Sequence, residues 1–378
     1  MTILSMALGI IVLLWIQRAV YRRFWDNELD MQMRFSAEEA FEGDRLSLIE
    51  ELTNAKPLPL PWVAAKFQIS KNLLFLHREN SQVSDDFYQN DLFSVNMFQR
   101  ITRKLDFRCG RRGFYRIKSM TLASSNLFIS DRLVKHLPCH AQLTVLPRTI
   151  AYEGMELLYR QIDGAVTVRR FTNPDPFDFR GIREYQPRDD FRSVNFKATA
   201  KAGALMVNIR SATASQELAI FLNLQSYSAY PSDDVFEESI RLAATAAGHF
   251  MAQGLAVSLV CNGLDVTTDR PLYIPAGVGQ GHWRTMMRGL ARINEKAEPS
   301  PMGHQLAAQN RPEPVYLLIS SYDGPDFAQA FETMLGRGLV VKWILPALPD
   351  AKINVGEHAG ILRWEVSPNR THFYQKAV

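Results

Sequence analysis

The feature that most constrains this chain is an apolar run close to its first residue. The segment TILSMALGIIVLLWI carries no charged side chain. Continued to Tyr21, the run gives roughly 20 residues, enough for one helix to cross the hydrocarbon core of a bilayer. The arginines that follow are Arg18, Arg22 and Arg23, with aromatic residues beside them. Because this pattern is typical of the end of a membrane span, we expect residues 1–23 to form a transmembrane anchor.

The charge around the run also predicts an orientation. Positive charge lies on its C-terminal side, and flanks rich in Lys and Arg stay in the cytoplasm. A cleaved signal peptide would need a basic segment before the apolar run and a small-residue cleavage site after it, and the sequence shows neither. We therefore expect a single pass with the C-terminal bulk cytoplasmic. The alternative is a short helix buried in protein.

Composition places the rest of the chain among folded multidomain proteins. Its 378 residues are 47% hydrophobic and 11% aromatic, which is ample for two or three cores. The net charge of +4 is too small to argue for nucleic-acid binding. Cys109, Cys139 and Cys261 are odd in number and lack metal-ligand spacing, so we expect free thiols in a reducing compartment.

Residues 29–148 alternate between apolar and polar side chains in short segments. FSVNMFQRITRKLDFRC and GFYRIKSMTLASS, for example, are parted by a turn that holds two glycines. We count about seven such segments and no convincing long helix, which predicts an antiparallel, β-sandwich-like domain. Residues 149–210 are polar and broken by glycine and proline, so we interpret them as a connector.

Residues 211–378 alternate between strand and helix patterns. The apolar strands ELAIFLNLQ, LAVSLVCNG, PVYLLISS and LVVKWILPA are separated by amphipathic segments such as DDVFEESIRLAATAAGHFMAQG. This alternation predicts a doubly wound parallel sheet, so the whole chain is an α+β multidomain protein. Ligands of such sheets bind at the C-terminal ends of the strands. The ends that we consider are Asn223–Ser228, Cys261–Asp265 and Ser320–Gly324.

The connector contains a densely charged stretch, FRGIREYQPRDDFRSVNFKATAK. Nine of the 22 residues after Phe179 are charged. A catalytic interpretation would use Asp189 and Asp190 as acid and base, but adjacent side chains diverge, and no histidine or glycine-rich phosphate loop accompanies them. A nucleic-acid interpretation would use the arginines and Tyr185, but the acids dilute the positive field.

We favour a structural interpretation of this stretch. Its charged side chains would satisfy one another in an ion-pair lattice, with bidentate contacts between arginine and carboxylate and with the aromatic rings packed underneath. The members of this lattice would be Arg183, Glu184, Asp189, Asp190 and Arg192. A surface for docking a partner, built from the same residues, remains the alternative.

The stretch FDFRGIREYQPRDDFRSVNFKATAKAGALMVNIR resembles the signature of the bacterial domain of unknown function family 58. The matching positions are Phe179, Arg183, Glu184, Tyr185, Asp189, Arg192, Lys197, Ala200, Gly203, Leu205 and Val207. The sequence departs from the signature at Arg188, where glycine is usual, and at Phe196, where tryptophan is usual. A second element, GRRGFYRIKSMTLASSNLF, is similar to the Arg-Gly-x-Tyr element of the family at Arg112, Gly113 and Tyr115.

This resemblance implies an order of parts: membrane anchor, β-rich region, signature, and an α/β domain similar to von Willebrand factor A. It also implies a place in the bacterial inner membrane. The family has no established biochemical activity. Its members commonly accompany MoxR-type AAA+ ATPases, which implies a protein partner and an envelope-related or chaperone-like role.

Von Willebrand factor A domains often carry a metal site with the pattern Asp-x-Ser-x-Ser after the first strand. The corresponding residues here are Asn223, Leu224, Gln225, Ser226 and Tyr227. The carboxylate has become an amide and neither serine is in register, so Asp323 remains as a lone acid. We expect a degenerate site without metal or cofactor, whose rim residues Ser226, Tyr227 and Tyr322 contact a partner.

These observations predict a non-catalytic, membrane-anchored scaffold or adaptor that acts through protein–protein contacts, with a MoxR-type AAA+ ATPase as the implied partner. The alternative is a metal-dependent adhesion-type binding protein, or a hydrolase, that uses the same strand-end rim. The missing Asp-x-Ser-x-Ser pattern favours the first.

Overall fold

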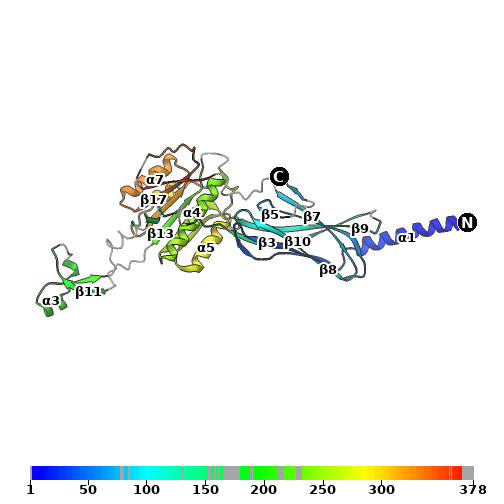
Figure 1. Cartoon of the computed structure of the whole chain (residues 1–378), viewed down its shortest axis with the longest axis horizontal. Coiled ribbons are helices and arrows are strands. Elements are labelled where there is room, and N and C mark those ends of the chain that lie inside the picture. The colour runs from blue at the N-terminus through cyan, green and yellow to red at the C-terminus, as the bar shows by residue number, and fades with distance from the viewer. Residues whose placement is uncertain are drawn as a thin grey trace. The chain divides into compact units, whose positions relative to one another are not determined.

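A computed structural model gives the fold of this chain (Figure 1). It describes residues 2–76, 81–83, 86–128, 131–151, 179–187, 189, 191–210, 217–226, 232–356, 358 and 360–367, together with 155, 156, 159, 160, 162 and 164. The chain divides into two compact units. Unit 1 comprises Met1–Arg148, Leu290–Arg292 and Asn369–Val378, and unit 2 comprises Thr149–Gly289 and Ile293–Pro368.

The apolar run forms one helix, α1 (Thr2–Phe24), as predicted. By length and composition α1 can cross a membrane. Its last turn is held by the rest of unit 1, because Tyr21 is buried and its hydroxyl donates a hydrogen bond of 2.7 Å to the carbonyl oxygen of Pro59. Trp25, directly after the helix, is buried as well. The C-terminal end of α1, which we call the root of the helix, is therefore packed into unit 1.

Two sheets of strands make up the rest of unit 1. The first has the order β1-β3-β8-β5, with β1 (Leu29–Phe35), β3 (Arg45–Asn54), β8 (Gln99–Cys109) and β5 (Leu73–Phe75). The second has the order β2-β10-β9-β4-β7-β6, with β2 (Glu39–Phe41), β10 (Arg132–Leu146), β9 (Gly113–Ser125), β4 (Leu60–Ser70), β7 (Asp86–Val95) and β6 (Ser81–Val83). The pairing is antiparallel except between β10 and β2.

The two sheets share one hydrophobic core. Leu48 and Phe107 from the first sheet and Ile117 and Leu143 from the second belong to it, and all four are fully buried. The described strands number ten, against the seven or so that we predicted. The additional ones have three residues each (β2, β5 and β6), which is too short for the apolar alternation that identifies a strand in a sequence.

The signature motif folds into a small element group of its own. Strand β11 (Phe179–Glu184) pairs antiparallel with β12 (Met206–Arg210), and between them lie the short helices η1 (Phe191–Ser193) and α3 (Phe196–Ala202). Asn195 caps α3, because its side-chain oxygen accepts from the amide of Ala198. Gly203 ends the helix at φ 65, a left-handed conformation that glycine adopts without steric cost.

Unit 2 contains a mostly parallel six-stranded sheet with the order β15-β14-β13-β16-β17-β18. Its strands are β13 (Glu217–Asn223), β14 (Ala256–Leu264), β15 (Pro271–Gly277), β16 (Val315–Ser320), β17 (Val341–Ala347) and β18 (Ile361–Glu365). Only the edge strand β15 pairs antiparallel among them. The four predicted strands are present, whereas β15 and β18 are half-exposed edge strands that the apolar pattern did not reveal.

Helices cover both faces of this sheet (Figure 1). Helices α6 (Gly303–Ala307) and α7 (Pro325–Gly336) share a core with Phe221, Leu318 and Trp343. Helix α4 (Asp233–Ala252) contacts β13, β14, β16 and β17 without joining that core, and α5 (Gly279–Ala291) lies beside α4. The structure is therefore α/β here, with helices where the sequence predicted them.

The strand order identifies where such a sheet can bind a ligand. From β13 the chain moves to β14 on one side and then returns to β16 on the other side of β13. Because the connections diverge at this point, a crevice forms outside the carboxyl ends of the two adjacent strands.

Candidate functional site

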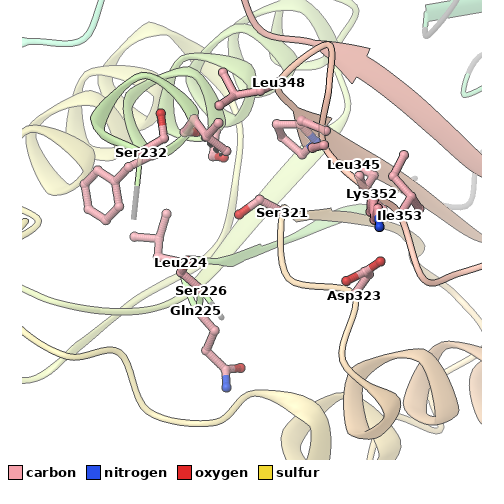
Figure 2. Close-up of a pocket in the computed structure, with 16 residues that line it drawn as sticks. Leu224, Gln225, Ser226, Ser232, Ser321, Asp323, Leu345, Leu348, Lys352 and Ile353 are labelled. Atoms are coloured by element: carbon pink, nitrogen blue, oxygen red, sulfur yellow. Dashed lines mark hydrogen bonds between the residues drawn. The ribbon is translucent and has the colours of Figure 1, made fainter. Parts of the chain in front are cut away.

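A cavity of about 310 Å³ lies at the carboxyl ends of β13, β16 and β17, beside the start of α4. We call it the strand-end pocket. Figure 2 shows Leu224 and Ser226 on one side of it, Lys352 and Ile353 on the other, and Ser321 between them. Its further lining residues are Gln225, Ser232, Val235, Phe236, Ser239, Asp323, Leu345, Pro346, Ala347, Leu348 and Ala351. The pocket coincides with the crevice that the strand order predicts.

Asn223 occupies the position where an aspartate would carry charge, and both its side-chain oxygen and its side-chain nitrogen are hydrogen-bonded. Its side-chain oxygen accepts from the Asn262 amide at 2.6 Å, and its nitrogen donates to the Ser320 hydroxyl at 3.0 Å. The oxygen also accepts from the backbone amide of Gln225 at 3.2 Å. These groups are buried, so a neutral hydrogen-bonded network joins the ends of three strands. The network supplies rigidity rather than a free ligand oxygen.

The neighbouring loop residues have different roles. Gln225 lines the pocket, and its side-chain oxygen accepts from the backbone amide of Met302 at 3.1 Å. Ser226 is exposed and lines the pocket. Tyr227 lies outside the described residues.

Asp323 is buried and holds the opposite wall of the pocket. One carboxylate oxygen accepts from the backbone amide of Asn354, and the other accepts from the Asn354 side chain at 3.1 Å. This pair fixes the segment that follows β17, which carries Lys352 and Ile353 into the pocket. Asp323 therefore positions the pocket wall instead of standing free as a metal ligand.

Tyr322, a predicted rim residue, does not line the pocket. Its hydroxyl donates to a carboxylate oxygen of Asp326 at 2.9 Å, and its ring lies against Gly324. A Cβ on Gly324 would lie 2.1 Å from the tyrosine ring, so the close approach needs glycine at this position. The tyrosine closes the start of α7, and only Ser226 of the described rim residues faces the cavity.

The pocket combines an apolar floor with hydroxyl groups and one lysine. Lys352 is exposed and makes no ion pair with any residue that the structure describes. Across the described part of the chain, no group of three or more His, Cys, Asp or Glu side chains is placed to hold a metal ion. This composition suits a bound group of mixed polarity, because apolar contact provides affinity and a few polar groups fix orientation.

We predicted an ion-pair lattice in the signature. Among the described residues, the structure shows one bidentate ion pair of this lattice. The guanidinium of Arg183 donates to both carboxylate oxygens of Asp189, each at 2.6 Å. Asp189 also accepts from the backbone amide of Gln186 at 2.8 Å, so the pair closes the turn after β11. Because the two side chains are 40% and 17% exposed, the pair is a partly solvated turn lock.

The remaining signature residues do not join this turn lock. Glu184 and Lys197 are exposed, whereas Asp190 and the side chains of Phe179 and Arg192 lie outside the described residues. Tyr185 packs edge-on against Phe191 at 6.4 Å. Our expectation that the aromatic rings pack underneath is wrong for Phe191 and Phe196, which are 62% and 71% exposed. A two-stranded sheet with a seven-residue helix has too little surface to cover them.

Part of the pocket escaped the sequence reasoning. Val235 and Phe236 belong to the first turns of α4, and Leu345, Leu348 and Ile353 come from the end of β17 or follow it. Ligands of parallel sheets bind at the carboxyl ends of the strands, and the sequence predicted LVVKWILPA as a strand. Considering the end of that strand as well would have identified Leu345, Leu348 and Ile353.

Two solved structures are each similar to about a third of this chain. A chain of a cohesin–dockerin complex from Clostridium thermocellum is 9% identical, with 31% of this chain and 99% of that chain covered at a TM-score of 0.22. A non-cellulosomal cohesin from Archaeoglobus fulgidus is 12% identical, covers 34% and 98% of the two chains, and has a TM-score of 0.21. Likeness at this level supports no conclusion about fold or function. The curated proteins contain no match.

One family model does match. Residues 181–357 fit the model described as "Protein of unknown function DUF58", and this range begins inside the signature and extends through most of the six-stranded sheet. The resemblance that the signature indicated is confirmed. Residues 181–357 of this chain therefore match the DUF58 family.

Proposed function

We propose that this protein is a membrane-anchored, non-catalytic adaptor whose α/β unit receives a side chain of a partner protein in the strand-end pocket. One observation carries the proposal: the crevice of the sheet holds a cavity of about 310 Å³, while the polar groups at the ends of β13 and β16 are bonded to one another. Among the described residues, the carboxylate and amide groups at the base of this recess, Asp323 and Asn223, are engaged in hydrogen bonds.

The contacts of the pocket favour binding over metal-dependent chemistry. A Mg²⁺ ion needs near-octahedral oxygen ligands and gives up its water reluctantly. Asp323, the one carboxylate among the described lining residues, is engaged by both amide groups of Asn354, and Asn223 supplies a neutral amide that is already bonded. We therefore assign neither a metal nor a cofactor to the site.

The proposal includes a setting. Helix α1 serves as a single-pass anchor in the bacterial inner membrane, with both units in the cytoplasm. Unit 2 is von Willebrand factor A-like, and its partner is a MoxR-type AAA+ ATPase that acts in envelope or complex assembly. The apolar length of α1, the arginines after it and the parallel sheet with a strand-end recess support this setting. The choice of ATPase rests on family association alone.

Capture of that ATPase by full-length protein variants tests the proposal. Lys352→Glu reverses the charge of the pocket lysine, and Ser321→Trp fills the cavity between its walls. Lys296→Glu makes the same charge change at an exposed lysine outside the pocket lining and serves as the matched control. We expect the two pocket variants to lose the co-purified ATPase and the control to retain it. Equal retention by all three variants would refute a role for the pocket.

A further inference from the structure

We propose that the end of unit 1 from which α1 leaves is itself a membrane-binding surface, where two loop tips insert apolar side chains into the lipid interface. One tip is the turn between β7 and β8, with Met97 and Phe98. The other follows β9 and carries Leu127 and Phe128. We call these four residues the apolar tips. This surface depends on α1 being a membrane anchor, as the proposed function has it.

The strand register places both tips at one end of the sandwich. In the first sheet Asn54, the last residue of β3, pairs with Leu29, where β1 begins, and with Gln99, where β8 begins. In the second sheet Ser125, the last residue of β9, pairs with Arg132, where β10 begins. Since Phe98 directly precedes Gln99 and Leu127 follows Ser125 by two residues, each tip extends beyond the last paired residues of its sheet.

Hydrogen bonds join the two sheets at this end. The side-chain amide of Asn54 donates to the carbonyl oxygen of Asn96 at 2.8 Å. The backbone amide of Phe98 donates to the carbonyl oxygen of Lys56. The Lys56 ammonium in turn donates to the carbonyl oxygen of Asn27 at 2.8 Å, which lies in the link between α1 and β1. The first tip is therefore fixed close to the root of the helix.

An ion-pair clamp fixes the second tip against α1 itself. The Asp131 carboxylate accepts from Arg18 at 2.6 and 2.7 Å and from Arg22 at 3.0 Å. Asp131 comes three residues after Phe128, and its side chain is nearly buried beneath the two arginines. The uncharged part of the helix ends at Gln17, one residue before the clamp. The second tip therefore lies level with the boundary between the uncharged segment of α1 and the arginines that follow it. In a membrane-spanning helix this boundary lies at the membrane surface.

The tips expose large apolar side chains that water solvates poorly. Phe98 is 70% exposed and Phe128 is 59% exposed, and Met97 and Leu127 are exposed to a similar extent. Phe98 also has a φ of 50, a left-handed conformation that a bulky residue adopts at a steric cost and that glycine or asparagine would adopt more easily. An aromatic residue at such a position indicates that its side chain contributes a contact that outweighs the steric cost.

The neighbouring charges fit lipid headgroups. Arg18, Arg22 and Arg23 surround the helix end, and Arg132 begins β10 beside the second tip, with all four exposed. Aromatic and aliphatic side chains flanked by arginines are typical of protein segments that lie at the boundary between headgroups and acyl chains. Arg18 and Arg22 share the single Asp131 carboxylate, so the four arginines and this carboxylate together remain positively charged, which complements an anionic leaflet. Because α1 crosses the same plane, lipid is the occupant that continuity with the anchor predicts.

Spin labels on the full-length protein in nanodiscs of phosphatidylcholine and phosphatidylglycerol test this surface. The three cysteines of the described chain are all buried, so the unsubstituted protein provides the labelling blank. Met97→Cys and Phe128→Cys report on the tips, and Leu13→Cys reports on the anchor. Leu76→Cys is the matched control, because Leu76 is apolar and 47% exposed but lies far from the tips. Its backbone amide donates to the carbonyl oxygen of Asp106, and Asp106 is seven residues, or about 23 Å, along β8 from Gln99.

Accessibility of each label to oxygen, which partitions into lipid, and to a polar nickel complex gives the result. We expect the oxygen-to-nickel ratio at positions 97 and 128 to be several-fold higher than at position 76. Ratios at 97 and 128 as low as at 76, with a lipid-like ratio at 13, would overturn the surface and leave the anchor standing. A water-like ratio at 13 would overturn both. Protection of positions 97 and 128 from both reagents would mean that protein, not lipid, covers the tips, and would overturn the proposal as well.

Discussion

At the scale of single residues, the core of unit 1 contains a carboxyl group that loses its charge on folding. Glu50 on β3 is fully buried. Burial raises the pKa of its carboxyl group to about 9, the Asp91 carboxylate acts in the same direction, and the Arg103 guanidinium opposes both. Arg103 does not neutralise Glu50, because its guanidinium donates to Asp91 at 2.9 Å.

Glu50 should therefore make stability fall as pH rises. The folded pKa lies above the unfolded value of 4.5, so the folded state retains a proton that the unfolded state releases. Stability is lost from about pH 4.5 to about pH 9, with a cost on the order of 3 kcal/mol at pH 7. Glu50→Gln keeps the shape and should remove this loss. We expect thermal melts of the full-length variant to match the unsubstituted protein near pH 4.5 and to exceed it at pH 8.

Glu51→Gln is the control for this prediction, because Glu51 lies on the opposite face of β3 and pairs with Arg100 at 3.3 Å. It should leave the pH dependence unchanged. A Glu50→Gln protein that melts below the unsubstituted protein at pH 8 would show that the carboxyl group is stabilising in its charged form.

Also at the residue scale, Asp323 is expected to act on the pocket wall and not on a metal. Calorimetric titration of the full-length protein with Mg²⁺ or Mn²⁺ should be silent at millimolar concentration, because a single engaged carboxylate leaves a divalent cation largely uncompensated. Asp323→Ala should cost about 1–3 kcal/mol, since it leaves the amide groups of Asn354 without their acceptor. A saturable metal site that disappears in Asp323→Ala would contradict this view and favour metal-dependent adhesion.

At the scale of elements, the Arg183–Asp189 pair should hold one turn and little else. Asp189→Ala removes the acceptor for Arg183 and for the backbone amide of Gln186, so the turn after β11 loses its closure. Partly exposed ion pairs contribute little to global stability. We expect faster hydrogen exchange in peptides that contain Gln186 and unchanged exchange in β13 and β16. Glu184→Ala, at an exposed neighbour, is the control, and a collapse of protection across the six-stranded sheet would contradict a local role.

At the scale of the whole molecule, the position of a truncation should separate anchoring from folding. Removing residues 2–17 deletes the uncharged part of α1 and keeps Tyr21, whose buried ring and hydrogen bond to Pro59 belong to unit 1. We expect this protein in the soluble fraction with an intact melt. Removing residues 1–23 should also release it, but with a loss of about 3–5 kcal/mol because a large aromatic side chain leaves the core.

Fractionation with a carbonate wash, followed by thermal melting, distinguishes these outcomes. Retention of the shorter truncation in washed membranes would show that the uncharged part of α1 is not required for anchoring. Equal melting of the two truncations would show that the burial of Tyr21 contributes nothing to unit 1.

The sequence by itself determined the features that depend on neighbouring residues. Helix α1 follows from an uninterrupted apolar run, and α4, α5 and α7 follow from amphipathic spacing between apolar strands. The signature that identifies the family is likewise a local pattern of residues. Each is encoded within a window about as long as the element itself, so reading along the chain is sufficient.

Only the tertiary structure decided which side chains meet. Asn223 bonds to Asn262 and to Ser320, 39 and 97 residues away, and these partners follow from the order of strands in the sheet. The strand-end pocket and the clamp of Asp131 on Arg18, 113 residues apart, have the same origin. Local spacing fixes the backbone period of an element, whereas strand order and register depend on non-local burial, which no short window of sequence encodes.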